Sequence, residues 1–163
     1  MVTERSPLDL PAAGSRVEVL LAEDDRELRR FLALALQHDG YRVTEVDSGH
    51  ALLDQLWNRA ASKASFDLII SDVHMPGFTG LEILEILRDA DDPDDEYAPH
   101  IHDTPVILIT AFGDLRLHAD ARRLGAVVFD KPFDVDELRA FAVTLVQPVD
   151  EFGSLYREHG GGD

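Results

Sequence analysis

The sequence predicts an α/β protein built on a single doubly wound five-stranded parallel sheet with five helices. Three observations indicate this fold class. Strand-like and helix-like segments alternate along the chain. Runs such as 106–109 are apolar on consecutive residues, which is typical of strands that are buried on both faces of a parallel sheet. The 163 residues are 45% hydrophobic, which is enough for one domain with its own core.

Five short apolar runs bounded by polar or turn-forming residues are expected to form the strands. In chain order they are residues 17–22, 42–46, 68–71, 105–110 and 126–129. A buried parallel sheet needs helices on each of its faces, and the segments between these runs supply them.

Apolar residues recur at helical spacing between the strands and predict five helices. These patterns cover residues 28–36, 52–60, 81–87, 114–124 and 138–145. Asp47 or Ser48 is expected to cap the second helix and Asp134 the last, and Trp57 is expected in the core. The fourth helix has only a thin apolar face.

Composition excludes several kinds of site and partner. The net charge of −17 repels nucleic-acid phosphates and anionic membranes over a Debye length of about 8 Å. There is no cysteine, so disulfides and thiolate metal sites are excluded. No apolar run approaches the roughly 20 residues that span a bilayer, and residues 1–16 lack the apolar core of a signal peptide. We therefore expect a cytoplasmic protein that binds neither nucleic acid nor membrane, with a basic protein or a cation as its partner.

The chain is expected to hold one domain, at residues 17–147. Residues 1–16 carry two prolines and small or polar residues, which predicts a flexible lead-in. Residues 89–103 contain seven acidic side chains and no Lys or Arg, which predicts a solvated insertion after the third helix. Residues 148–163 end in a run of glycines and form a tail too short for a second domain.

Polar side chains with related chemistry follow four of the predicted strands. They are Glu23, Asp24 and Asp25 after the first strand, Asp72 after the third, Thr110 at the end of the fourth and Lys131 after the fifth. The carboxyl ends of parallel strands meet at one edge of the sheet, where such folds bind their ligands. We therefore expect these carboxylates, the hydroxyl and the ammonium to lie together.

This combination suits a divalent metal and a phosphoryl group. Two unit charges 4 Å apart repel by about 4 kcal/mol at an effective dielectric near 20, and such crowding is tolerated where a cation binds. Oxygen ligands favour Mg²⁺. A carboxylate free of the metal can attack phosphorus to form an aspartyl phosphate, while a lysine and a hydroxyl hold the transferred oxygens. The alternative is structural: Glu23, Asp24 and Asp25 taken alone are more typical of a helix cap, Asp72 also suits a cap, and Lys131 suits an ordinary surface position.

Four segments of the chain resemble the receiver domains of two-component response regulators. They are residues 20–25, 67–77, which contain the Asp-x-x-Met-Pro-Gly signature, 106–111, and 130–133, which contain Lys-Pro-Phe. The resemblance covers about residues 17–147 and implies the flavodoxin-like strand order 2-1-3-4-5, as in the chemotaxis member of the family.

The resemblance also implies a role for each site residue. Asp72 corresponds to the phospho-accepting aspartate. Glu23 and Asp24 correspond to the acidic pair that binds Mg²⁺ together with Asp72 and the backbone carbonyl of His74. Thr110 corresponds to the switch hydroxyl and Lys131 to the phosphoryl-binding lysine.

The chain departs from the family pattern at the switch position, and its spacing is also longer than usual from Asp72 to Thr110 and about one residue shorter from Thr110 to Lys131. Three residues before the lysine, where many members carry a switch aromatic, this chain has Val128, and Phe129 follows it. Switching is therefore expected to depend mainly on Thr110 rather than on an aromatic ring at this position.

The resemblance implies a signalling receiver and not an enzyme. Its partners would be a sensor histidine kinase or a histidine phosphotransfer protein, and a downstream protein target or a further phosphorelay step. One alternative is a Mg²⁺-dependent phosphatase of the aspartyl-phosphate type, which usually needs a second acid at the position of His74. Another is a receiver-like interaction module that works without phosphorylation, which the intact set of site residues disfavours.

Overall fold

A computed structural model describes residues 16–89 and 103–146 and contains five strands and five helices in strict alternation in these ranges. The strands are β1 (Glu18–Ala22), β2 (Arg42–Val46), β3 (Leu68–Asp72), β4 (Val106–Thr110) and β5 (Val127–Asp130). The helices are α1 (Arg26–His38), α2 (Gly49–Ala61), α3 (Gly80–Asp89), α4 (Leu115–Arg123) and α5 (Val135–Val146). Each lies within a few residues of the segment predicted from the sequence.

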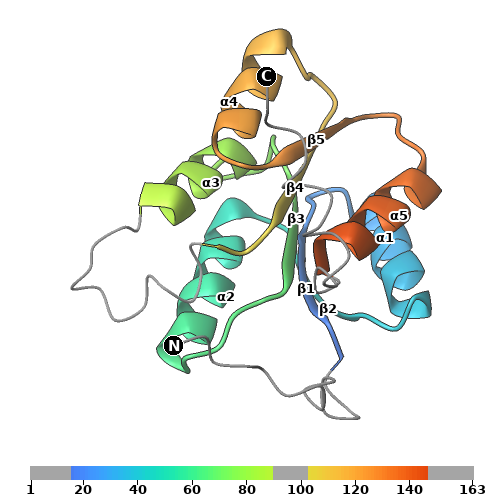
Figure 1. Cartoon of the computed structure of the whole chain (residues 1–163), viewed down its shortest axis with the longest axis vertical. Helices are drawn as coiled ribbons and strands as arrows, with labels where there is room; N and C mark the ends of the chain where they lie inside the picture. Colours follow the sequence, from blue (N-terminus) through green and yellow to red (C-terminus); the bar gives the residue numbers. More distant parts are fainter. Residues whose placement is uncertain (1–15, 90–102, 147–163) are drawn as a thin grey trace, which may run out of the picture.

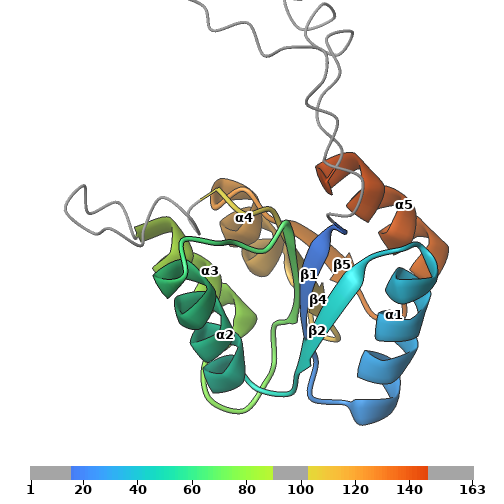
Figure 2. The ribbon, with the colours of Figure 1, turned by 90° about the horizontal axis from the view of Figure 1, so that it is seen from below.

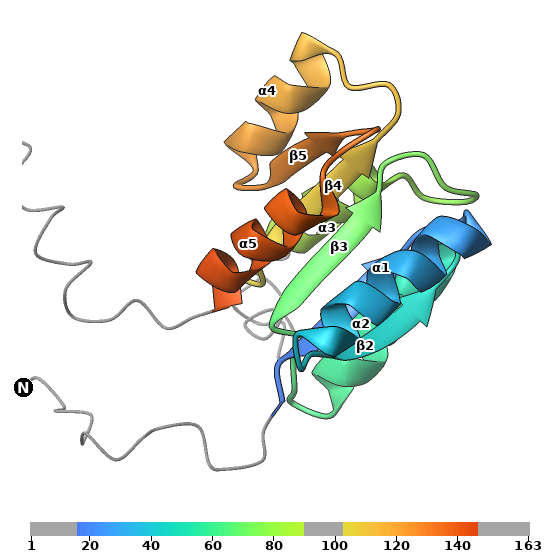
Figure 3. The same cartoon turned by 90° about the vertical axis from the view of Figure 1, so that its right-hand side faces the viewer.

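The five strands form one parallel sheet in the order β2-β1-β3-β4-β5, which confirms the predicted fold class and strand order. Helices α2, α3 and α4 cover one face and α1 and α5 the other (Figures 1 and 2). Figure 3 looks onto the face that carries α1 and α5. The sheet is therefore the central layer of three.

Side chains of the strands alternate between the two faces and fill two separate cores. In β1, Leu20 and Ala22 belong to the core under α2, α3 and α4, whereas Val19 and Leu21 belong to the core under α1 and α5. Every residue of β3 and of β4 is buried. The consecutive apolar runs seen in the sequence thus reflect burial on both faces.

Most predicted helix starts agree with the structure. Ser48, rather than Asp47, caps α2 by accepting the Ala51 N–H at 3.2 Å. The side chain of Asp134 accepts the Asp136 N–H at 2.8 Å at the start of α5. The prediction for Trp57 was wrong, because its residue is 39% exposed on α2. The buried stripe of that helix contains Leu52, Leu53, Leu56 and Ala60, and it leaves position 57 at the margin.

Apart from their boundary residues, the lead-in at 1–16, the acidic insertion at 89–103 and the tail at 148–163 lie outside the described residues. Within the described ranges, no helix combines the length and the apolar character needed to cross a membrane.

The register of the sheet determines what meets at its carboxyl edge. Ala22 is paired with Ser71, and Asp72 is paired with Ile109. The residues that follow β1 therefore lie beside the end of β3. Thr110 is paired with Asp130, so the residue after β5 lies beside the end of β4.

Candidate functional site

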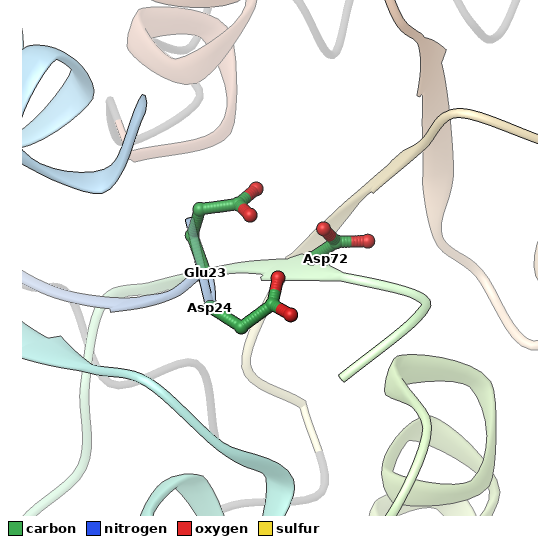
Figure 4. A group of neighbouring side chains, drawn as sticks. All are labelled: Glu23, Asp24 and Asp72. Atoms are coloured by element: carbon green, nitrogen blue, oxygen red, sulfur yellow. The ribbon is translucent and has the colours of Figure 1, made fainter. Parts of the chain in front are cut away.

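Three carboxylates converge at this edge: Glu23 and Asp24, just after β1, and Asp72, at the end of β3 (Figure 4). One oxygen atom from each lies within 4.8 Å of the other two. Glu23 and Asp72 are buried, whereas Asp24 is exposed, so the cluster is open to solvent on one side. Three carboxylate oxygens form a donor set that suits a hard cation such as Mg²⁺. The structure thus brings together the three side chains that the sequence predicted as metal ligands.

Lys131 reaches the same cluster from the end of β5. Its Nζ donates to Asp72 Oδ2 at 2.8 Å and to Glu23 Oε2 at 3.0 Å. One ammonium group faces three carboxylates, so the site keeps an excess of negative charge that a divalent cation would offset.

Burial and crowding shift the pKa values of this cluster. Burial is the main cause that raises the pKa of Glu23 to about 7, and the charge of Asp72 adds to it, while hydrogen bonds from Lys131 and from the Asp25 N–H act in the opposite direction. For Lys131, burial alone would lower the pKa of the ammonium group, but its hydrogen bonds to Asp72 and Glu23 outweigh burial and raise it. The lysine therefore stays charged, and Glu23 is the group of this pair whose protonation changes near neutral pH.

The carboxylate of Asp72 is held at both oxygens. Oδ1 accepts the His74 N–H at 2.9 Å, and Oδ2 accepts the Lys131 ammonium. Its backbone is held as well, because the Ser71 hydroxyl donates to the Asp72 carbonyl at 2.9 Å. A Cβ atom at position 80 would lie 2.6 Å from the same carbonyl oxygen, so only Gly80 lets α3 begin this close to Asp72.

Thr110 is buried at the end of β4, on the same edge. Its Oγ1 accepts the Phe112 N–H at 3.1 Å, and its carbonyl accepts the Lys131 N–H at 2.7 Å. Among the described residues the Thr110 hydroxyl donates to no acceptor, and the backbone N–H of the lysine is hydrogen-bonded directly to this threonine.

The acidic triplet after β1 combines the two interpretations that its sequence allowed. Asp25 caps α1 by accepting the Leu28 N–H at 2.8 Å. Glu23 and Asp24 belong instead to the carboxylate cluster. A capping residue and two site residues are thus adjacent, and their spacing in the sequence alone does not separate them.

Two residues that support the site were not anticipated. Arg29 Nη1 donates to the Glu23 carbonyl at 2.7 Å and holds the turn between β1 and α1. Gly80 allows the close approach of α3 described above. A glycine directly before a helical pattern was the available signal for Gly80, whereas nothing in the sequence pattern distinguished Arg29 from its neighbours Arg26 and Arg30.

Aromatic side chains lie at the rim of the site and behind it. The rings of His74 and Phe112 are in edge contact at 5.8 Å, and Phe112 is 78% exposed. Val128 packs into the core on the α4 side of the sheet, whereas Phe129 faces α5 and contacts Phe133 and Phe141. On the α4 face, β5 therefore carries a valine at the position where a switch aromatic was considered.

The sequence matches a known family over most of its length. Residues 19–142 match the response regulator receiver domain, and this range includes the whole carboxylate cluster, Thr110 and Lys131. The chain is 32% identical to the transcriptional regulatory protein FixJ of Bradyrhizobium diazoefficiens over 130 residues, which is 79% of this chain and 56% of FixJ. It is 30% identical to sporulation initiation phosphotransferase F of Bacillus subtilis over 123 residues, 75% of this chain and 87% of that protein.

Solved structures show the same fold. The chemotaxis response regulator CheY4 of Vibrio cholerae superimposes with a TM-score of 0.63 at 28% identity, covering 80% of this chain and 99% of CheY4. The receiver domain of Francisella response regulator 1452 gives a TM-score of 0.65 at 25% identity, covering 80% of this chain and 97% of that domain.

The chain spans about half the length of FixJ and of the transcriptional regulatory protein YkoG of Bacillus subtilis, 56% and 47% respectively. Receiver domains act as phosphoryl-accepting signalling modules of two-component systems. On the strength of the matched range and of these relatives, the chain belongs to the response regulator receiver family.

Proposed function

We propose that this protein is a response regulator that accepts a phosphoryl group on Asp72 in a Mg²⁺-dependent reaction. The donor is a sensor histidine kinase or a histidine phosphotransfer protein. The observation that carries the proposal is the position of Asp72, with one oxygen 2.8 Å from Lys131 Nζ and with two further carboxylates beside it. An isolated helix cap would need neither the lysine nor the second and third carboxylates.

The transfer step follows from the groups around Asp72. One oxygen of the ionised carboxylate attacks the phosphorus of the donor phosphohistidine, the P–N bond breaks, and its electron pair returns to the imidazole nitrogen. An aspartyl phosphate results. Lys131, which pairs with Asp72 before transfer, then pairs with an oxygen of the phosphoryl group.

Glu23, Asp24, Asp72 and the backbone carbonyl of His74 are the groups that we expect to hold Mg²⁺. The bound ion would neutralise negative charge that gathers on the phosphoryl oxygens. Asp24 is the most accessible of the three carboxylates and is the expected direct ligand. Ionised Glu23 is needed for the full charge of the site, and its raised pKa makes that charge depend on pH near neutrality.

Thr110 is proposed to transmit the signal. Its hydroxyl proton is available, and donation to a phosphoryl oxygen would draw the threonine and the loop bonded to it toward Asp72. The altered surface then binds a downstream protein or passes the phosphoryl group to a further phosphorelay partner. Since Val128 occupies the α4 face of β5, this coupling rests on Thr110.

A phosphatase of the aspartyl-phosphate type is the second function considered. Such enzymes usually need a second acid two residues beyond the nucleophile, where this chain has His74, whose ring contacts Phe112. We therefore propose a signalling role and not an enzymatic one.

The single-domain organisation, the domain bounds at residues 17–147 and the cytoplasmic location remain predictions. So does the absence of nucleic-acid binding, because several relatives are transcriptional regulators.

Incubation with acetyl phosphate and Mg²⁺, followed by intact-mass measurement, tests the proposal. We expect one acid-labile addition of about 80 Da that requires Mg²⁺ and is lost in Asp72→Asn. Asp54→Asn, which changes an exposed aspartate on α2, is the matched control and should be labelled like the wild type. Labelling of Asp72→Asn to a similar extent would contradict the assignment.

A further inference from the structure

A cleft of about 440 Å³ lies at the end of the sheet opposite the carboxylate cluster. We call it the amino-end cleft, because Glu18 and Arg42, the first residues of β1 and β2, line it. The C-terminal half of α2 and the loop before β3 complete the lining. Its volume lies within the roughly 300–1,000 Å³ typical of small-molecule sites. A five-residue strand is about 17 Å long, which separates the cleft from Asp72.

Two guanidinium groups converge in the amino-end cleft. Arg42 Nη1 lies 3.2 Å from Glu18 Oε1, and Arg59 Nη2 lies 2.8 Å from Glu18 Oε2. Arg59 is also stacked on the ring of Phe66, with its guanidinium carbon 4.4 Å from the ring centroid. The edge strand β2 thus places the Arg42 guanidinium beside Glu18, and α2 places the Arg59 guanidinium there as well. Stacking on Phe66 holds the Arg59 guanidinium in position.

These donors are only partly used. An arginine carries five N–H groups, and within residues 16–89 and 103–146 Arg42 and Arg59 each make one hydrogen bond through their side chains. Gln55 and Asn58 also line the cleft, and their side-chain amides make no hydrogen bond to another described residue. Most of the hydrogen-bond donors of the cleft are therefore free to bind a ligand with several acceptor oxygens.

The charge of the lining favours an anion. Two guanidinium groups face one carboxylate, which leaves a net positive lining in a protein whose net charge is −17. Asp67 accepts the Glu18 N–H at 2.7 Å but does not line the cleft. A phosphate monoester has three terminal oxygens and up to two charges, and it can accept from both arginines and an amide at once. A carboxylate offers fewer acceptors, and Glu18 already supplies one.

We propose that the amino-end cleft binds a small molecule that carries a phosphate monoester. Arg42 and Arg59 hold the phosphate through their free N–H groups, and the amides of Gln55 and Asn58 contact the rest of the ligand. Glu18 orients the two arginines and also competes with the ligand for them. This site goes beyond the proposed function and does not depend on phosphorylation of Asp72.

Titrations of the full chain with inorganic phosphate, AMP and succinate at constant ionic strength test the proposal, followed by ¹H–¹⁵N correlation spectra that include the arginine Nε–H signals. We expect saturable shifts at Arg42, Arg59 and the amides of Gln55 and Asn58. The dissociation constant should be in the millimolar range or below for phosphate and AMP, with AMP at least about threefold tighter because its body fills more of the cleft.

A matched pair of variants locates the effect. Arg42→Gln should weaken binding about tenfold or more. Arg30→Gln should leave binding unchanged, because Arg30 does not line the cleft. It is a matched control, since its side chain on α1 is similarly exposed (59% against 66%) and forms a comparable ion pair with Glu45 on β2. Glu18→Gln should tighten binding because it removes the competing carboxylate, whereas Glu45→Gln makes the same charge change without a gain.

Three outcomes would overturn the proposal: shifts that do not saturate, equal binding by Arg42→Gln and the wild type, or succinate that binds as tightly as phosphate. The last of these would indicate a general anion site. Labelling of Asp72 by acetyl phosphate in Arg42→Gln should be normal. The proposed function and the amino-end cleft can therefore fail independently of one another.

Discussion

The two ends of the sheet both hold ion pairs, but the excess charge is positive at the amino end and negative at the carboxyl end. At the amino end, two exposed or half-exposed arginines share Glu18. At the carboxyl end, one lysine, whose side chain is 22% exposed, faces two buried carboxylates and a third beside them. Buried charge is costly unless it is paired, and exposed ion pairs contribute little to stability. The comparison teaches that the excess negative charge of the carboxyl end lies on buried groups and costs the fold stability, whereas the excess positive charge of the amino end lies near the surface and costs little.

Removal of the central cation at each end should give the largest contrast. Lys131→Met leaves the buried carboxylates of Glu23 and Asp72 without a cationic partner, and we expect it to lower the free energy of unfolding by about 3 kcal/mol at pH 8. Arg42→Met removes an ion pair of an exposed side chain and should cost less than about 1 kcal/mol. Urea denaturation of both variants gives the comparison. Equal losses would mean that the carboxyl end carries no special electrostatic cost.

The pH dependence of stability should sharpen the contrast. The pKa of Glu23 is raised in the folded state to about 7 from an ordinary 4.5, so its neutral form favours folding. This contribution to the free energy of unfolding is fully present below pH 4.5, the pKa of Glu23 in the unfolded chain, and it is lost as the pH rises through 7. Glu23→Gln keeps the side chain neutral. We therefore expect it to match the wild type near pH 4.5 and to be more stable by about 3 kcal/mol at pH 8.

Denaturation of the wild type and Glu23→Gln across this pH range measures the effect. Excess Mg²⁺ at pH 8 should reduce the difference between the two, because only the ionised carboxylate adds its charge to a cation site. A difference that stays constant from pH 4.5 to 8 would show that Glu23 titrates like an exposed glutamate.

Partial relief of the same repulsion should have a smaller effect. Asp24→Asn removes one of the three charges, and since Asp24 is exposed we expect a gain in stability of about 1 kcal/mol without metal. Mg²⁺ affinity should fall at the same time. Asp67→Asn, an exposed aspartate near the amino end, is the control and should leave Mg²⁺ affinity unchanged. Unchanged Mg²⁺ binding in Asp24→Asn would exclude this side chain as a ligand.

The smallest expected effect is on dynamics. Phosphorylation should change hydrogen exchange most in residues 112–124, which follow Thr110, and least in residues 17–22, which begin at the amino end. Ala121 is the only buried residue of α4, and weakly packed elements shift at low cost. Thr110→Ala should remove most of the change in exchange while Asp72 is still phosphorylated. A change centred on residues 89–103 would place the output in the acidic insertion instead.

Much of the fold was predictable because burial on both faces of a parallel sheet leaves consecutive apolar residues in the sequence. The strand order came from the resemblance, since periodicity does not specify which strands pair. The prediction for Trp57 was wrong because helical spacing does not separate the buried face of a helix from a residue at the edge of that face.

The site was predictable as a set and not in its details. Strand ends brought Glu23, Asp24, Asp72 and Lys131 together, as parallel pairing requires. The separate role of Asp25 as a cap depends on local backbone geometry. The contact of Arg29 with the Glu23 carbonyl depends on where one long side chain lies once the helix has formed. Sequence spacing carries neither kind of information.

The pairing of Lys131 with Glu23 joins residues that are 108 positions apart, and its pairing with Asp72 spans 59. Closing loops of this length has an entropic cost that is recovered only when β1, β3 and β5 are all in place. No local fragment of the chain can assemble the acceptor. Under the proposed function, the capacity to take up a phosphoryl group is therefore a measure of the folded population, and we expect a partly folded or truncated chain that lacks β5 not to be phosphorylated.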